Sequence, residues 1–258
     1  MNSSSDQASR YIMIKTAVTI QARMTSTRLP GKILKPALGR PLLEFMIERL
    51  RKIKAADEII LCTTTNDTDD ILVEYADEWG ILCFRGSEHD VMSRVLGAAE
   101  HYDVETIVET TSDCPLIDPE ICDQVYQKYL STRADYCSNV YKRCFPIGMD
   151  VQVFSTKVLA DAFSRTDDPE EREHVSLFIY RHPELYDLKW IEAPEHQFDP
   201  KLRLTLDTPE DYQVICRIFE DLYPKNQDFT LDDVLAYLAQ NQWLRDINND
   251  VQHKWVKY

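Results

Sequence analysis

Residues 15–32 read K-T-A-V-T-I-Q-A-R-M-T-S-T-R-L-P-G-K, a β-branched run followed at once by a loop rich in cations and hydroxyls. The run Lys15 to Ala22 predicts a buried strand. The loop carries Arg23, Arg28 and Lys32, with a glycine before the lysine that lets backbone N–H groups approach a ligand. Cations and N–H donors that converge after a first strand are what a polyphosphate requires. The alternative is a solvated basic loop. Neither G-x-G-x-x-G nor G-x-x-x-x-G-K-[ST] occurs here, so dinucleotide-fold and P-loop mechanisms gain no support.

Strands and helices alternate four times along the first half of the chain. Further strands are predicted at 58–64, 81–84 and 105–111, and helices after Pro41, over 67–79, over 89–102 and from Asp118 onward. Such alternation predicts an α/β fold with a mostly parallel sheet and helices on both faces.

The middle third of the chain has a different pattern. Runs at 136–141, 148–154 and 188–193 resemble strands separated by short helices, which predicts a small inserted β/α subdomain over about 134–200. A strand at 202–206 and a helix capped by Thr208 follow. We therefore expect a single domain over 13–245, a disordered lead-in at 1–12 and a polar tail at 246–258.

Composition excludes several classes of function. The 258 residues include 29 Lys+Arg and 44 Asp+Glu, a net charge of −15, whereas a protein that tracks a nucleic-acid backbone normally shows the opposite balance. A small phosphorylated ligand in a local basic pocket remains open. No apolar run is long enough for a membrane helix, and the polar N-terminus lacks a secretory signal, so we expect a cytoplasmic protein without a membrane partner. The seven cysteines form no C-x-x-C pair, which predicts free thiols in a reducing compartment.

Two aspartates follow predicted strands at which a ligand is expected to bind. Asp113 follows 105–111 and Asp207 follows 202–206, and ligands of open parallel sheets bind at the carboxyl ends of the strands. Two such carboxylates can converge, and hard oxygen ligands suit Mg²⁺. Asp207 could instead belong to a capped helix start, but Thr208 can supply that cap. Asp118 is expected to be a structural N-cap, whereas Asp150 could face the pocket or not.

Several motifs, in order, resemble one known family. A-R-x-x-S-T-R-L-P-G-K (22–32), D-C-P-L-I-D-P (113–119) and L-D-T-P-E-D-Y (206–212) are similar to the cytidylyltransferases that make CMP-activated sugars, including the 3-deoxy-manno-octulosonate and acylneuraminate enzymes. R-G-S-E-H-D (85–90), G-M-D-V-Q-V-F (148–154) and R-E-H-V (172–175) resemble the SpsF-like spore-coat-polysaccharide branch in particular. Because Ser-Asp-Cys-Pro stands where octulosonate enzymes have G-D-E-P, the resemblance does not identify the acceptor.

The resemblance implies a Rossmann-like nucleotidyltransferase fold, of the nucleotide-diphospho-sugar transferase type, acting as a homodimer with Mg²⁺ and CTP. The hydroxyl of a small acidic or phosphorylated acceptor, of the sugar-acid type, would attack the α-phosphorus and release pyrophosphate, for surface polysaccharide or glycan synthesis. Catalytic roles fall on Lys32, Asp113 and Arg23, and metal binding on Asp113 and Asp207. Nucleotide binding falls on Gln21, Ala22, Arg23, Ser26, Arg28, Gly31, Lys32, Arg85, Gly86, Ser87 and Ser112. Acceptor binding falls on His174, Asp150, Arg94, Lys142 and Arg143.

Three points are left open by the sequence. If the R-E-H-V segment is helical, Arg172 and His174 cannot point the same way, and we expect His174 to reach the substrate. The same fold could use another nucleotide or a non-sugar acceptor, such as a phosphorylated alcohol or acid. A non-catalytic nucleotide-binding protein is a third possibility, against which the pair Asp113 and Asp207 argues.

Overall fold

The computed structural model describes residues 14–252, so the lead-in expected at 1–12 and the last six residues lie outside the described part of the chain. The strands are β1 (Ile14–Gln21), β2 (Pro36–Ala37), β3 (Arg40–Pro41), β4 (Glu58–Thr64), β5 (Leu82–Gly86), β6 (Val104–Thr111), β7 (Tyr136–Ser138), β8 (Gln152–Ser155) and β9 (Leu188–Trp190). The α-helices are α1 (Leu42–Leu50), α2 (Asp70–Glu78), α3 (Val91–His101), α4 (Pro119–Thr132), α5 (Thr156–Arg165), α6 (Pro169–Glu173), α7 (Leu177–Arg181), α8 (Pro209–Leu222), α9 (Leu231–Gln240) and α10 (Gln242–Asn248). Short 3₁₀ turns are η1 (Lys32–Leu34), η2 (Asp67–Asp69) and η3 (Glu195–Gln197).

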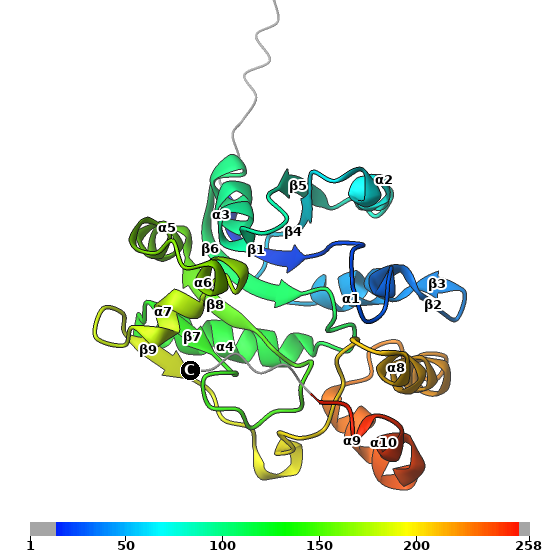
Figure 1. Ribbon diagram of the computed structural model, residues 1–258. Helices are drawn as coiled ribbons and strands as arrows, with labels where there is room; N and C mark the ends of the chain where they lie inside the picture. Colours follow the sequence, from blue (N-terminus) through cyan, green and yellow to red (C-terminus); the bar gives the residue numbers. More distant parts are fainter. Residues whose placement is uncertain (1–13, 253–258) are drawn as a thin grey trace, which may run out of the picture.

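Within residues 14–252, one central sheet of seven strands has the order β5-β4-β1-β6-β8-β7-β9 (Figure 1). β5, β4, β1 and β6 run parallel, and β8 is antiparallel to both β6 and β7. β7 and β9 are parallel to each other. The predicted α/β fold with a mostly parallel sheet is confirmed, and the Rossmann-like topology puts the carboxyl ends of β1 and β6 side by side.

Helices cover both faces of this sheet (Figure 1). Alternate residues of β1 and β6, such as Ala17 and Ile107, pack against α3, α5 and α7, while Val18, Ile20 and Val108 pack against α1, α4 and α8. Residues 16–20 of β1 are all buried, as expected for a strand covered on both sides. No helix among the described residues is long and apolar enough to cross a membrane.

The region 134–200 extends the sheet. Its strands β7, β8 and β9 continue the sheet beyond β6, and α5, α6 and α7 lie beside them. Of the expected polar tail, residues 246–248 belong to α10. There Asn248 is buried, and its Nδ2 lies 2.9 Å from Asp211 Oδ1 and 3.2 Å from the Arg203 carbonyl.

The strand predicted at 202–206 is wrong as an element of the sheet. This segment is extended, but its only ladder contact among the described residues is an isolated parallel bridge between Ile147 and Arg203. The apolar alternation of Leu202, Leu204 and Leu206 arises because these residues are buried in the core beside α8. Alternation of apolar and polar residues indicates only that every second side chain is buried. A buried extended segment therefore shows the same sequence pattern as a strand of the sheet.

Candidate active site

A cleft with two lobes opens at the carboxyl ends of β1 and β6. The first lobe, of about 370 Å³, is lined by Arg23, Arg28, Lys32 and Arg94, and we name it the basic lobe. The second, of about 250 Å³, is lined by Glu109, Asp150 and Arg143 among others, and we name it the acidic lobe because carboxyls dominate it. The residues that line both lobes are Gln21, Thr111, Asp113, Glu173, His174 and Asp207.

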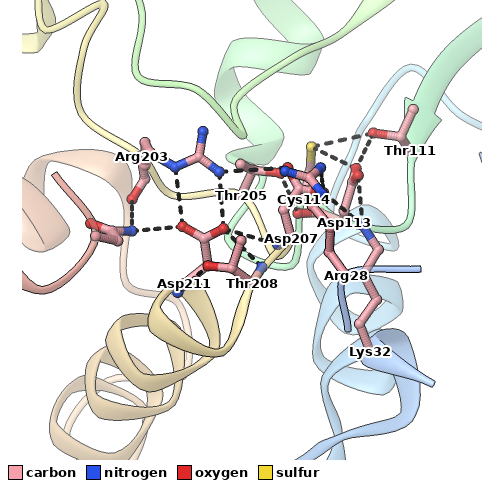
Figure 2. Close-up of polar contacts among 11 residues, drawn as sticks. Arg28, Lys32, Thr111, Asp113, Cys114, Arg203, Thr205, Asp207, Thr208 and Asp211 are labelled. Atoms are coloured by element: carbon pink, nitrogen blue, oxygen red, sulfur yellow. Dashed lines mark hydrogen bonds and ion pairs between the residues drawn. The ribbon is translucent and has the colours of Figure 1, made fainter. Parts of the chain in front are cut away.

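The ammonium group of Lys32 lies between the two predicted aspartates. Its Nζ is 3.0 Å from Asp113 Oδ2 and 3.0 Å from Asp207 Oδ1 (Figure 2). Burial works to lower the pKa of Lys32, but the two carboxylates outweigh it and raise this pKa above the ordinary value. Burial likewise works to raise the pKa of Asp113, and Lys32 with the Thr111 hydroxyl more than offsets it, so this pKa is lowered. Lys32 and Asp113 therefore both carry charge at neutral pH.

The extended segment 202–206 brings the two aspartates together. The Leu204 amide donates to the Ile147 carbonyl at 2.7 Å, and the Leu206 amide donates to the Asp113 carbonyl at 2.8 Å. The Thr205 hydroxyl lies 3.1 Å from the same Asp113 oxygen. These bonds join the end of the segment to the loop after β6, so Asp207 emerges next to Asp113.

A buried ion pair between Arg203 and Asp211 holds Asp207 in position. Arg203 binds Asp211 through two hydrogen bonds, at 3.1 and 2.9 Å, and its guanidinium also lies 3.5 Å from Asp207 Oδ2 (Figure 2). Asp211 accepts from the backbone amides of Asp207 and Thr208, both at 3.1 Å. Thr208 caps α8 in return, which confirms the predicted cap and leaves the Asp207 carboxylate free to face the cleft.

The loop between β1 and η1 supplies the cations of the basic lobe. Arg28 lies 2.9 Å from Asp207 Oδ1, so it joins the same charge cluster as Lys32. Arg23 is more exposed and lies 3.5 Å from Glu88 Oε1. Ser26 lines the lobe as well, as do Ala22 and Ser112 from the adjoining strand ends.

Two acidic residues that sequence reasoning missed hold this loop in place. Buried Asp69 accepts from the Met24 amide at 2.8 Å and from the Thr64 hydroxyl at 2.5 Å. Glu88 accepts from the Thr25 hydroxyl at 2.8 Å. Both lie in neighbouring βα loops, and no local pattern shows which distant loop a carboxylate will anchor.

Gly31 shapes the loop and does not line either lobe. Its φ is +65°, a left-handed conformation that favours glycine, and its N–H donates to the Met24 carbonyl at 3.1 Å. That N–H is therefore used inside the loop and is not directed at a ligand. The residue turns the chain so that Lys32 enters the cleft.

Arg85, Gly86 and Ser87 are not among the residues that line either lobe, and the nucleotide-binding role predicted for them stays a prediction. The Arg85 guanidinium donates to the carbonyls of Thr64 at 2.8 Å and Asn66 at 2.9 Å, and it pairs with Asp70 at 2.6 Å. Packing explains the glycine at position 86, because a Cβ there would lie 2.9 Å from Arg94 Cγ.

Arg94 lies in the basic lobe, and the acceptor-binding role predicted for it stays a prediction. It is 3% exposed and lines the basic lobe, whereas the sequence suggested acceptor binding. Its NH1 donates to the Ser87 carbonyl, and its Nε has no hydrogen-bond partner among residues 14–252. Burial lowers the pKa of this guanidinium, whose charge suits an anionic ligand.

Lys142, for which acceptor binding was predicted, is not among the residues that line either lobe. Its Nζ stacks 4.3 Å above the centre of the Trp190 ring, away from the cleft. Arg143 and Asp150, by contrast, line the acidic lobe and bind each other through two hydrogen bonds of 2.9 Å. Asp150 therefore faces the pocket, and its partner there is a cation of this chain.

His174 and Arg172 point to different places. His174 follows α6 and lines both lobes. The residue is exposed, but the protein around its ring desolvates it and lowers its pKa. Arg172 instead stacks on Phe163 and donates to the Thr166 carbonyl at 2.8 Å. Val175, which follows His174, has a φ of +24°, a strained conformation for a β-branched residue. This conformation interrupts the helix between α6 and α7.

Glu109 is the main cleft residue that sequence reasoning missed. It lies on β6, is 3% exposed, lines the acidic lobe and accepts from Gln21 Nε2 at 2.5 Å. Burial raises its pKa to about 8, against the hydrogen bond from Gln21. The sequence does place a charged residue, Glu109, inside the predicted buried strand 105–111. That could have indicated a functional residue, since glutamate is rarely fully buried unless it is paired.

The carboxylates of Asp113 and Asp207 fit a magnesium ion. No group of three or more His, Cys, Asp or Glu side chains suited to a metal occurs in the described part of the chain. Mg²⁺, however, is usually held by one or two carboxylates and completes its shell with water and substrate phosphates. Both carboxylates already reach one cation, the Lys32 ammonium, so they converge closely enough to share another.

Known proteins resemble this chain in sequence and fold. The sequence profile of the cytidylyltransferase family matches residues 17–244. The spore coat polysaccharide biosynthesis protein SpsF of Bacillus subtilis is 36% identical over 228 residues, covering 86% of this chain and 93% of its own. A cytidylyltransferase structure from Leptospira borgpetersenii superposes with a TM-score of 0.85 and 33% identity, over 94% of this chain and 100% of the other. A CMP:2-keto-3-deoxy-manno-octonic acid synthetase solved with CTP shares the fold, with a TM-score of 0.60, 14% identity and coverage of 80% and 98%.

The fold, with its cleft at the ends of β1 and β6, and these relatives define the protein as a nucleotidyltransferase enzyme. The chain belongs to the cytidylyltransferase family, as the sequence motifs predicted.

Proposed function

We propose that the protein transfers CMP from CTP to a sugar-acid acceptor with Mg²⁺ and releases pyrophosphate, for the synthesis of a surface polysaccharide or glycan. The observation that carries the proposal is the contact of Lys32 with both Asp113 and Asp207, with Arg28 beside them. The names of two relatives, a spore-coat polysaccharide protein and a synthetase solved with CTP, support the pathway and the nucleotide.

The basic lobe suits the triphosphate. Arg23, Arg28, Lys32 and Arg94 supply positive charge there, and transfer of a phosphoryl-type group depends mainly on positioning and charge neutralisation. Lys32 would stabilise the charge that develops on departing pyrophosphate. Asp113 and Asp207 would hold Mg²⁺, which when bound would neutralise phosphate charge.

The acidic lobe would hold the acceptor. The acceptor hydroxyl forms a bond to the α-phosphorus while the bond from that phosphorus to the β-phosphate oxygen breaks. His174 lines both lobes, and its lowered pKa leaves it neutral at pH 7, so its ring can accept a hydrogen bond from the attacking hydroxyl.

Pyrophosphate release measured with each of the four NTPs tests the proposal. The acceptors are a panel of 2-keto-3-deoxy sugar acids, sugar phosphates and phosphorylated polyols. We expect release with CTP and a sugar acid, and none with Asp113→Asn, because the amide cannot replace a carboxylate on the metal. Asp232→Asn, an exposed residue outside the cleft, is the matched control and should keep full activity. Turnover by Asp113→Asn would refute the metal role, and release only with a phosphorylated polyol would refute the sugar acid.

We also propose that the enzyme acts in the cytoplasm as a homodimer, as its resemblance to the family implies. All seven cysteines are unpaired in the structure, which agrees with a reducing compartment. Sedimentation at micromolar concentration tests the dimer, and a monomeric mass there would refute it.

A further inference from the structure

Glu109 lines the acidic lobe, and one oxygen of its carboxyl lacks a hydrogen bond. Its Oε1 accepts from Gln21, and the nearby Ser176 hydroxyl, which donates to Gln152 Oε1 at 2.7 Å, also works to lower its pKa. Its Oε2 is buried and has no hydrogen-bond partner among the described residues. An unsatisfied buried carboxyl oxygen is costly, and in a native structure it needs an explanation.

The surroundings of Glu109 favour the uncharged form of its carboxyl. On the same face of the sheet it lies in register with Thr19 on β1 and Gln152 on β8. The Oε1 of Gln152 is already taken by the hydroxyls of Tyr136 at 2.5 Å and Ser176 at 2.7 Å. No ion pair of Glu109 occurs within residues 14–252. The other carboxyls that line the lobe would repel a further negative charge, and they are Asp113, Asp150, Glu173 and Asp207.

We propose that Glu109 is an acceptor-binding residue that stays protonated and donates a hydrogen bond from Oε2 to an oxygen of the acceptor, such as a carboxylate oxygen. This inference rests on the proposed function and assigns the acceptor specificity of the acidic lobe to one residue. A neutral acid explains how a lobe rich in carboxyls accepts an anionic substrate: the proton of Glu109 supplies a donor in place of a repelling charge.

The proposal has a definite dependence on pH. Burial raises the pKa of Glu109 to about 8, so the donor is present below pH 8 and is lost as the pH rises through that value. Above it, the carboxylate has no proton to donate and repels an acid.

Other titratable groups around Glu109 do not account for the same change. The pKa of His174 is lowered, and those of Cys62, Cys114 and Tyr136 are raised, so these four groups titrate away from pH 8. The remaining charged or titratable groups that line the lobe or face it from α3 and α7 are Arg94, Asp113, Arg143, Asp150, Glu173, Tyr180 and Asp207. Their contributions would remain when Glu109 alone is replaced, which a variant can show.

Calorimetric titration of 3-deoxy-manno-octulosonate into the protein, with Mg²⁺ and CMP present, tests this role without turnover. For the wild type we expect the Kd to rise about tenfold from pH 6.5 to pH 9.0, because the neutral fraction of Glu109 falls by about that factor. Glu109→Gln keeps a donor at every pH, so its Kd should stay constant. Glu109→Met lacks the donor and should bind about 10- to 100-fold more weakly at pH 6.5.

Controls separate this role from a structural one. Glu105→Gln changes an exposed glutamate on the same strand and should behave as the wild type at both pH values. Each variant should keep the wild-type thermal shift with CTP, which shows that the basic lobe is intact. If Glu109→Met does not fold, the constant Kd of Glu109→Gln alone decides the question.

The outcomes distinguish this inference from the proposed function. A Kd that changes with pH equally in wild type and Glu109→Gln, wild-type affinity in Glu109→Met, or no binding of the acid at either pH would overturn the role of Glu109. Pyrophosphate release with a pH-independent Kd would refute only Glu109, whereas the expected binding pattern without pyrophosphate release would refute only the transfer reaction.

Discussion

Lys32 shows how a single side chain connects two parts of the site. It arises from the loop after the first strand, yet its ammonium contacts carboxylates from residues 113 and 207, far along the chain. With the side chain only 13% exposed, the charge lies in partly desolvated surroundings where electrostatic effects are larger than in water. In the free protein it balances the two carboxylates, and in the complex it can turn to the phosphates.

Lys32→Ala should therefore raise the barrier to transfer by about 2 to 4 kcal/mol, the range for loss of one transition-state charge partner. The rate constant at saturating CTP and acceptor is the measurement. Lys52→Ala removes an exposed lysine that pairs with Asp228 outside the cleft, and it should leave the rate unchanged. A loss below about tenfold in Lys32→Ala would remove the lysine from the catalytic machinery.

At the scale of elements, the extended segment 202–206 matters most. It is held by backbone hydrogen bonds to Ile147 and Asp113, and close approach to residue 148 is part of that fit. Gly148 has a φ of +105°, and a Cβ there would lie 2.5 Å from the Leu204 carbonyl oxygen. Only glycine allows the two backbones to pass at this distance, so the position of Asp207 depends on it.

Gly148→Ala should destabilise the fold by at least about 2 kcal/mol, since backbone strain alone costs on the order of 1 to 3 kcal/mol. It should also reduce activity, because the displaced segment carries Asp207. Denaturant unfolding and pyrophosphate release measure the two effects. Gly80→Ala is the matched control: φ is +62° but a Cβ meets open space, so it should cost about 1 kcal/mol and leave activity intact. Equal behaviour of the two variants would contradict the close-approach argument.

On the scale of the whole molecule, a local basic lobe exists within a chain of net charge −15. The four cations of the lobe offset this charge only at the cleft, where β1, β6 and their loops meet. A ligand that binds there contacts elements from both halves of the chain, so its binding energy stabilises the entire fold.

CTP with Mg²⁺ should raise the thermal unfolding temperature more than ATP, GTP or UTP does. At 100 times its Kd, a ligand adds about 2.7 kcal/mol to the free energy of unfolding. Removal of Mg²⁺ with EDTA should reduce the CTP shift, because in the proposed mechanism Mg²⁺ joins Asp113 and Asp207 to the phosphates. Equal shifts with all four nucleotides would remove the cytidine assignment.

Much of this protein could be read from local sequence alone. The β-branched run 15–22, the helix caps at Asp118 and Thr208, and the motif of Lys32 depend on neighbours within a few residues. These local patterns predicted the parallel sheet, the loop and the family. Local pattern failed at 202–206, where a buried extended segment shows the same alternation as a strand of the sheet.

Only the tertiary structure decided which distant groups meet. It placed Arg94 in the basic lobe and Lys142 outside the cleft, and it showed Glu109 buried with an unpartnered oxygen. Residue type determines what a side chain can do, but its pKa and its partners depend on desolvation and on groups that approach from other strands. Those terms arise only once the sheet has formed and the loops have closed around its edge.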